Sequence, residues 1–170
     1  MFERLSPAIR ELQPEMNPED LKMLVPAFLR IWNHPDNLRF LSFTKIEFEE
    51  KWVREWCGGH IAVGVRYFGA TDPHDRFLAI LLTGQNPLEG FELMSIGVEP
   101  AEKRRGIGTA LIRHGVELAR QERYQAIEGK VFATNAPMLS LLLGEEFLPV
   151  RIEPRRGPVG EDLVHLRRYL

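Results

Sequence analysis

Apolar residues repeat with helical spacing in the first part of the chain. Asn17 and Pro18 precede the first such stretch and suit the N-cap and the first position of a helix. The apolar positions that follow predict one buried helix face: Leu21, Leu24, Val25, Phe28, Leu29 and Trp32. Pro26 lies inside this pattern, and we expect it to kink the helix or to split it in two.

A second amphipathic helix is predicted after a loop over residues 33–43. The residues Thr44-Lys45-Ile46-Glu47 have the spacing of a capping box, and Gly58 and Gly59 mark the end of the helix. Its expected buried stripe is Phe48, Trp52, Val53 and Trp56. This helical spacing favours a core role for the tryptophans over a substrate cage.

Runs rich in β-branched and aromatic residues predict six to seven strands. They cover residues 8–12, 61–68, 77–83, 91–98, 126–134, 147–152 and 162–169. Residues 69–76 are rich in turn formers, so the strands on either side are expected to form an antiparallel pair. The strands at 91–98 and 126–134 flank a helical pattern, which predicts a right-handed βαβ crossover.

A basic turn with two glycines joins the strand at Phe91 to the helix of this crossover. Residues 96–109 read IGVEPAEKRRGIGT, and Gly106 and Gly108 open the helical pattern. The free N–H groups of a helix N-terminus attract anions, and glycine lets an anion approach the backbone. The turn therefore has the layout of a phosphate site; the alternative is an ordinary strand-turn-helix corner with solvated charges. The inner face of the helix is predicted to be Ile107, Leu111, Ile112, Gly115, Leu118 and Ala119.

Composition narrows the class of protein. The chain has 170 residues, which suits one domain over 1–170, and its formal net charge is −2. The basic runs at 103–105 and 155–156 are short, so we expect no nucleic-acid partner. The single Cys57 excludes an internal disulfide and suits a reducing compartment, here the cytoplasm. The histidines are scattered without the spacing of metal ligands, so we expect no metal site. No apolar run approaches the length of a membrane span.

The order of elements and the glycine turn resemble the GNAT superfamily of N-acetyltransferases. The family signature is Arg or Gln, two residues, Gly, one residue, then Gly or Ala; here it reads Lys103-Arg104-Arg105-Gly106-Ile107-Gly108, with Lys103 at the Arg or Gln position. The resemblance covers essentially the whole chain. It implies an α/β (α+β) fold with a mixed, largely antiparallel sheet of six to seven strands and about four helices. Two of the strands would splay apart to form a coenzyme A cleft.

The resemblance implies acetyl-coenzyme A as cosubstrate, lying between the strands at Phe91 and Ala126. The backbone of Ile96 and Val98 would pair with the pantetheine amides, and the N–H near Ile96 would stabilise the oxyanion that develops on the thioester. The turn would hold the pyrophosphate through Lys103, Arg104, Arg105, Gly106, Ile107, Gly108 and Thr109.

A second family segment follows the strand at Ala126. It usually contains an Asn, a Tyr seven residues later, and Gly-Phe at the end of a short helix. Asn135 and Phe147 match, whereas Leu142 stands at the Tyr position and Glu146 at the Gly position. Asn135 would bind the pantetheine arm or simply cap the helix. Because Leu142 has no proton to give, the general acid is left open between water and Tyr124.

Acetyl transfer to an alkyl amine needs a base, since such an amine has a pKa of ~10.4 and is mostly protonated at neutral pH. Glu92 matches the glutamate that several histone-type relatives use as base. Strand alternation predicts that its side chain shares a face with Met94 and Ile96. The alternatives for Glu92 are a surface carboxylate and an ion-pair partner.

The family resemblance implies direct transfer to a primary amine, on a small molecule or a protein. The acceptor site would be built by the first two helices, the loop after the strand at 61–68 and the C-terminal hairpin. We expect Glu47, Glu49 and Glu50 to form a solvated helix face; the alternative is that their carboxylates attract a cationic amine. A non-catalytic acyl-coenzyme A sensor is the alternative function, favoured by Leu142. A homodimer is left open.

Overall fold

A seven-stranded sheet forms the centre of the molecule. The computed structural model describes residues 7–41, 45–59, 64–86 and 90–170. The strands run in the order β1-β2-β3-β4-β5-β7-β6, and every neighbouring pair except β4 and β5 is antiparallel. Their bounds are β1 Ala8–Leu12, β2 Arg66–Thr71, β3 Phe77–Asn86, β4 Gly90–Val98, β5 Ala126–Phe132, β6 Leu148–Glu153 and β7 Leu163–Tyr169.

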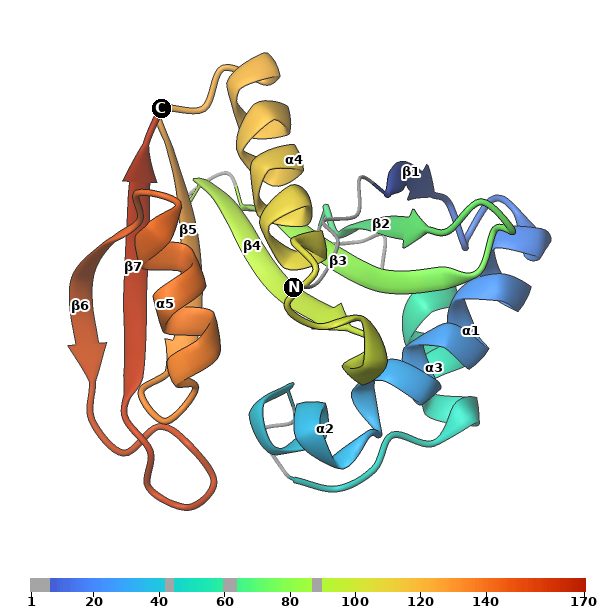
Figure 1. Cartoon of the computed structure of the whole chain (residues 1–170), viewed down its shortest axis with the longest axis horizontal. Coiled ribbons are helices and arrows are strands. Elements are labelled where there is room, and N and C mark those ends of the chain that lie inside the picture. Colours follow the sequence, from blue (N-terminus) through green and yellow to red (C-terminus); the bar gives the residue numbers. More distant parts are fainter. Residues whose placement is uncertain (1–6, 42–44, 60–63, 87–89) are drawn as a thin grey trace.

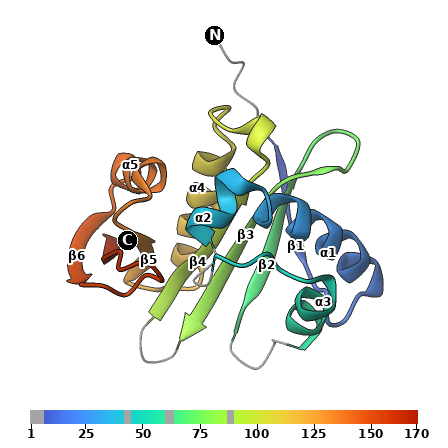
Figure 2. The ribbon, with the colours of Figure 1, turned by 90° about the horizontal axis from the view of Figure 1, so that it is seen from below.

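Helices cover both faces of the sheet. They are α1 Pro18–Trp32, α2 Pro35–Leu41, α3 Glu50–Gly59, α4 Ile107–Gln121 and α5 Ala136–Gly144, with a short 3-10 turn, η2, over Pro100–Glu102. α4 and α5 lie on one side, and α1 and α3 lie on the other (Figure 2). The mixed, largely antiparallel sheet predicted from the sequence is confirmed.

Alternation along β3 gives each face of the sheet its own core. Leu81 belongs to the cluster under α4, together with Leu111 and Phe147, whereas Leu82 belongs to the cluster under α1 and α3, together with Phe28. Successive side chains of a strand point to opposite faces, so one apolar strand supplies both clusters. The predicted inner face of α4 is confirmed, with Val116 buried as well.

Two predictions for the first third of the chain need correction. α1 continues through Pro26 as one helix, so the proline does not split it: Pro26 removes one helical hydrogen bond, while the buried face of the helix packs in the core on both sides of it. Residues 35–41 form α2 rather than a loop; its Asn37 amide donates to the carbonyls of Ile31 and Val98, 2.8 and 2.9 Å away. The described part of the chain therefore has five α-helices, where the family resemblance implies about four.

The second predicted helix also begins later than expected. Thr44 lies outside the described residues, residues 45–49 are not helical, and α3 starts at Glu50 and ends at Gly59 as predicted. Asn33 holds the extended segment before α3: its Oδ1 accepts from Phe48 N at 2.7 Å and its Nδ2 donates to Phe48 O at 2.9 Å. Trp52 is 49% exposed, so its predicted burial is wrong.

β2 is shifted relative to its prediction. It runs from Arg66 to Thr71, past the predicted end, and residues 61–63 lie outside the described residues. The predicted antiparallel pairing of β2 with β3 is confirmed, with the turn between them at residues 72–76.

Candidate active site

β4 and β5 separate soon after they meet. They pair in parallel at only three positions, from Phe91 opposite Ile127 to Leu93 opposite Gly129, and then diverge (Figure 1). The pocket between them is lined by Phe40, Leu93, Met94, Ser95, Ile96, Gly129, Lys130, Val131, Phe132, Asn135, Met138, Leu142 and Leu163. The splayed strands that the family resemblance implies are therefore present.

A β-bulge at Met94 lies at the start of this splay. On β3, Leu82 pairs with Ser95 and Thr83 pairs with Leu93, so Met94 is the extra residue of β4. A bulge adds one residue to a strand and re-aims the side chains beyond it. The alternation of β4 therefore changes phase inside the cleft.

This change of phase corrects the predicted placement of Glu92. Glu92 pairs with Gly84 and Ile96 pairs with Leu81, and residues 81 and 84 point to opposite faces of the regular strand β3. Ile96 packs in the core under α4, while Met94 contacts the Gly84 position on the other face. Glu92 shares its face with Met94 as predicted, but not with Ile96.

The backbone of Ile96 nevertheless points into the cleft. Glu99 N donates to Leu78 O across the β3 pair, at 2.8 Å. Because N–H directions alternate along a strand, the N–H groups of Ile96 and Val98 point away from β3, toward the side on which β5 has separated. The Val98 carbonyl on this side accepts from Asn37, so Val98 has its N–H left to offer.

The Glu92 carboxylate faces a cation from β5. Lys130 Nζ lies 3.2 Å from Glu92 Oε2, with the two side chains 32% and 26% exposed. Glu92 is thus an ion-pair partner, one of the alternatives considered for it, and it remains in contact with solvent. Lys130 is not predicted as a site residue from the sequence, because its partner Glu92 lies 38 residues away. Strand alternation of Lys130 with Gly129 and Val131 is the signal that could have placed its side chain on the face opposite theirs.

The α4 N-terminus presents free backbone donors. Gly106 is the N-cap, has a left-handed φ of 86°, and provides no side-chain cap. Ala110 N donates to Gly106 O at 3.0 Å, so the N–H groups of Ile107, Gly108 and Thr109 precede the helical hydrogen-bond ladder. These donors and the open space beyond Gly106, where a Cβ would meet nothing within 4 Å, fit a pyrophosphate.

The basic residues before Gly106 are placed differently from one another. Lys103 Nζ lies 3.5 Å from Asp36 O, and burial lowers the pKa of this ammonium against the opposing influence of Asp36. Arg104 adopts a left-handed φ of 63°. Arg105 donates to Glu102 Oε2 at 2.5 Å. The Arg105 charge is therefore partly neutralised by Glu102, whereas the backbone N–H groups at the start of α4 are not used by the helix.

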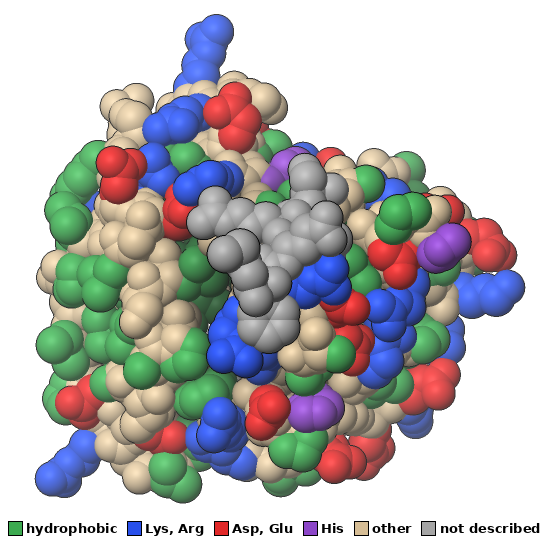
Figure 3. Space-filling view, in the orientation of Figure 1, with side chains coloured by type: hydrophobic (Ala, Val, Ile, Leu, Met, Phe, Trp, Pro, Cys, Tyr) green, Lys and Arg blue, Asp and Glu red, His purple; other side chains and the backbone are tan. Residues whose placement is uncertain are grey.

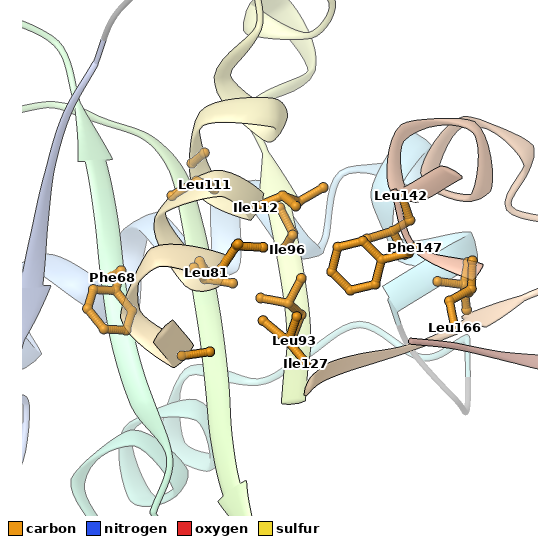
Figure 4. Close-up of a cluster of buried hydrophobic side chains, with 14 of the residues drawn as sticks. Phe68, Leu81, Leu93, Ile96, Leu111, Ile112, Ile127, Leu142, Phe147 and Leu166 are labelled. Atoms are coloured by element: carbon orange, nitrogen blue, oxygen red, sulfur yellow. The ribbon is translucent and has the colours of Figure 1, made fainter. Parts of the chain in front are cut away.

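The α5 segment forms the opposite wall of the cleft. Asn135 Oδ1 accepts from Met138 N at 3.3 Å, so this side chain caps α5 as well as lining the pocket. Leu142 is 2% exposed and Phe147 is fully buried. Figure 4 shows Phe147 between Leu142 and the β4 side chains Leu93 and Ile96, which places an apolar wall where the family usually has a phenol.

The other predicted participants lie away from the cleft. Tyr124 packs edge-on against Phe91, with ring centroids 5.4 Å apart, and does not line the pocket. Glu47, Glu49 and Glu50 are exposed, and Glu50 pairs with Arg54 at 2.8 Å. Within the described ranges, no three His, Cys, Asp or Glu side chains gather as a metal site. No helix among those same residues is long and apolar enough to cross a membrane.

Comparison with known proteins agrees with this architecture. The GNAT acetyltransferase family profile matches residues 22–144. An N-acetyltransferase from Staphylococcus aureus superposes with a TM-score of 0.78 at 18% identity, over 97% of this chain and 99% of that one. A ribosomal-protein-alanine N-acetyltransferase from Brucella melitensis superposes with a TM-score of 0.74 at 19% identity, over 96% and 99%. No curated protein sequence matches significantly. The chain belongs to the GNAT family of acetyltransferases.

Proposed function

We propose that this protein transfers an acetyl group from acetyl-coenzyme A to a primary amine. The observation that supports this most is the pair of backbone donor sites: the cleft-facing N–H of Ile96 and the N–H groups at the start of α4 that the helix does not use. Acetyl-coenzyme A supplies a thioester, whose arm would lie along β4 and whose pyrophosphate would rest on residues 103–109. Asn135, at the α5 wall, would contact the pantetheine.

Two groups of β4 would carry the chemistry. Glu92 takes a proton from the acceptor ammonium, directly or through water, and the amine then attacks the thioester carbonyl carbon. The Ile96 N–H donates to the oxygen that becomes negative, and the carbon–sulfur bond breaks. The attached nitrogen releases its second proton to solvent, and the thiolate takes a proton from solvent. The Ile96 N–H lies in the plane of the sheet while the Glu92 side chain leaves that plane, so the two groups act from different directions.

An acyl-coenzyme A sensor is the second candidate, favoured by Leu142 in the wall where a phenol is usual. Two measurements on the purified protein separate the functions. Mass spectrometry of copurified ligand identifies the donor, and thiol release from acetyl-coenzyme A is followed across a panel of amines and a metabolite extract. Thiol release with an acetylated product supports the enzyme; tight coenzyme A binding without release across the panel supports the sensor.

We also propose a cytoplasmic homodimer, paired through β6. β6 is an edge strand whose Leu148, Val150 and Ile152 are 58, 44 and 61% exposed, and apolar side chains gather along this edge in Figure 3. An antiparallel pair centred on Ile152 would set Arg151 of each copy opposite Glu153 of the other. Sedimentation should show a dimer that Ile152→Lys dissociates; a monomeric wild type would rule out the pairing.

A further inference from the structure

We infer that the acceptor is an α-amino acid with an apolar side chain, recognised by the Glu92–Lys130 pair. This inference rests on the proposed acetyl transfer and specifies its substrate. The Glu92–Lys130 pair lies on the face of the sheet opposite α5. Gly129 and Val131 of β5 face the α5 core, so Lys130 and Phe132 point to the other face, where Glu92 also lies.

The charges near this mouth are already paired. Arg167 holds Glu128, with Arg167 Nε 2.7 Å from Glu128 Oε1, and Glu153 contacts His165 Nε2 at 2.6 Å. Lys45, whose Nζ lies 6.0 Å from the centre of the Phe132 ring, pairs with Glu161 at 2.9 Å. Lys130 lines the pocket and contacts Glu92, which lies just outside the lining. A ligand that reaches Lys130 therefore meets one cation and one anion side by side.

This arrangement discriminates among amines. An amine with no other charge would place its ammonium at Glu92 and next to the Lys130 ammonium, and like charges at contact distance repel. It would also have to take Glu92 away from Lys130 and leave that cation half-buried without a carboxylate. An acceptor that brings its own carboxylate avoids both costs.

An α-amino acid has the required spacing. Its ammonium and carboxylate are attached to the same carbon, and Lys130 Nζ and Glu92 Oε2 are 3.2 Å apart. The ammonium would face Glu92 and the carboxylate would face Lys130, so that four charges alternate in sign. The amine then lies at the base, beside the β4 segment that carries the Ile96 N–H. Charge-assisted contacts of this kind are the strong ones in binding sites.

Most of the remaining lining of the pocket is apolar, apart from Ser95 and Asn135. Phe132 and Leu163, which face each other across β5 and β7, are 4% and 7% exposed, and Met94 and Phe40 line the same pocket. An apolar substituent on the acceptor would cover Met94, which is 42% exposed. Phenylalanine, leucine and methionine are therefore the first acceptors to test.

The experiment compares each amino acid with its decarboxylated counterpart, for example phenylalanine with phenethylamine. Wild type should show a kcat/KM at least about tenfold higher for the amino acid, since a charged hydrogen bond is gained. Lys130→Met, which keeps the aliphatic stem, should reduce this ratio about tenfold or more, and Lys130→Arg should restore part of it. Arg167→Met, which removes a cation of the same face outside the pocket, should leave the ratio unchanged.

The same pairs are titrated into the coenzyme A-loaded protein by calorimetry. Equal kcat/KM and equal binding of amino acids and decarboxylated amines would overturn the inference while leaving the acetyl transfer intact. An unchanged ratio in Lys130→Met would also overturn it. Lys130-dependent binding of amino acids without thiol release would support the recognition site and reject the acetyl transfer, so the two proposals fail separately.

Discussion

Two helix ends use the left-handed backbone conformation in different ways. At the start of α4, Gly106 has φ 86° and no side chain stands in the space beyond it. At the end of α5, Glu146 has φ 66°, where relatives usually have glycine, and its carboxylate pairs with Arg168 at 2.6 Å. Left-handed backbone costs a residue with a Cβ about 1–2 kcal/mol. In the turn before α4, glycine occupies the N-cap that would meet a phosphate, while Arg104 two residues earlier has a left-handed φ of 63° despite its side chain; the turn after α5 has Glu146 at its left-handed position.

The largest effect is expected at the α4 end. Gly108→Asp places a negative charge beside the pyrophosphate site, and two close like charges should weaken coenzyme A binding about a hundredfold or more. Calorimetry with coenzyme A measures the change. Gly108→Asn is the matched control, because both side chains must move the Leu141 methyl that lies 3.0 Å from an added Cβ. Equal affinities of the Asp and Asn variants would mean that the phosphate does not bind there.

The next effect concerns chemistry rather than binding. Glu92→Gln removes the base, so kcat should fall about a hundredfold while coenzyme A affinity stays nearly intact. The loss should be greatest at low pH, because the acceptor amine, with a pKa of ~10.4 for an alkyl amine, is then almost fully protonated. Glu128→Gln, the acid held by Arg167, is the control. A pH–rate profile identical to that of wild type would remove Glu92 from the mechanism.

A smaller effect separates the two functions of Asn135. Asn135→Ala should lower the free energy of unfolding by about 1 kcal/mol, because the Met138 N–H loses its cap. Asn135→Ser keeps a capping oxygen and should recover most of that stability. Both variants should bind coenzyme A a few-fold more weakly if the amide contacts pantetheine; urea unfolding and calorimetry test the two parts. If Asn135→Ser binds coenzyme A with the affinity of the wild type, Asn135 acts only as the N-cap of α5.

The two sides of the cleft also differ in how well the sequence predicts them. The glycine turn, the start of α4 and the splaying of β4 from β5 follow from local backbone requirements and from family resemblance. The bulge at Met94 does not, because alternation cannot reveal an extra residue in an apolar run. Because of this bulge, the Ile96 and Glu92 side chains point to opposite faces of the sheet, whereas simple alternation predicts the same face for both.

Long-range contacts explain the other differences. α2 is held by Asn37, whose amide reaches Val98, 61 residues away, and a seven-residue segment with weak periodicity gives no sign of that contact. Lys130 is one of five lysines in the sequence, and only the convergence of β4 and β5 makes it the neighbour of Glu92. Side chains that depend on the tertiary fold for their partners are thus the part of the site that local pattern misses.

The smallest predicted effect returns to the α5 end. Glu146→Gly removes the left-handed strain at the cost of a more flexible unfolded chain, so the net stabilisation should be about 0.5 to 1 kcal/mol. Losing the carboxylate matters little, because it is exposed and Arg168 still donates to Glu145 O at 2.9 Å. Glu146→Ala, which keeps the Cβ and the strain, is the control and should not stabilise. Urea unfolding compares the three proteins; if Gly and Ala behave alike, the left-handed turn carries no strain and glycine at Gly106 is there for the ligand alone.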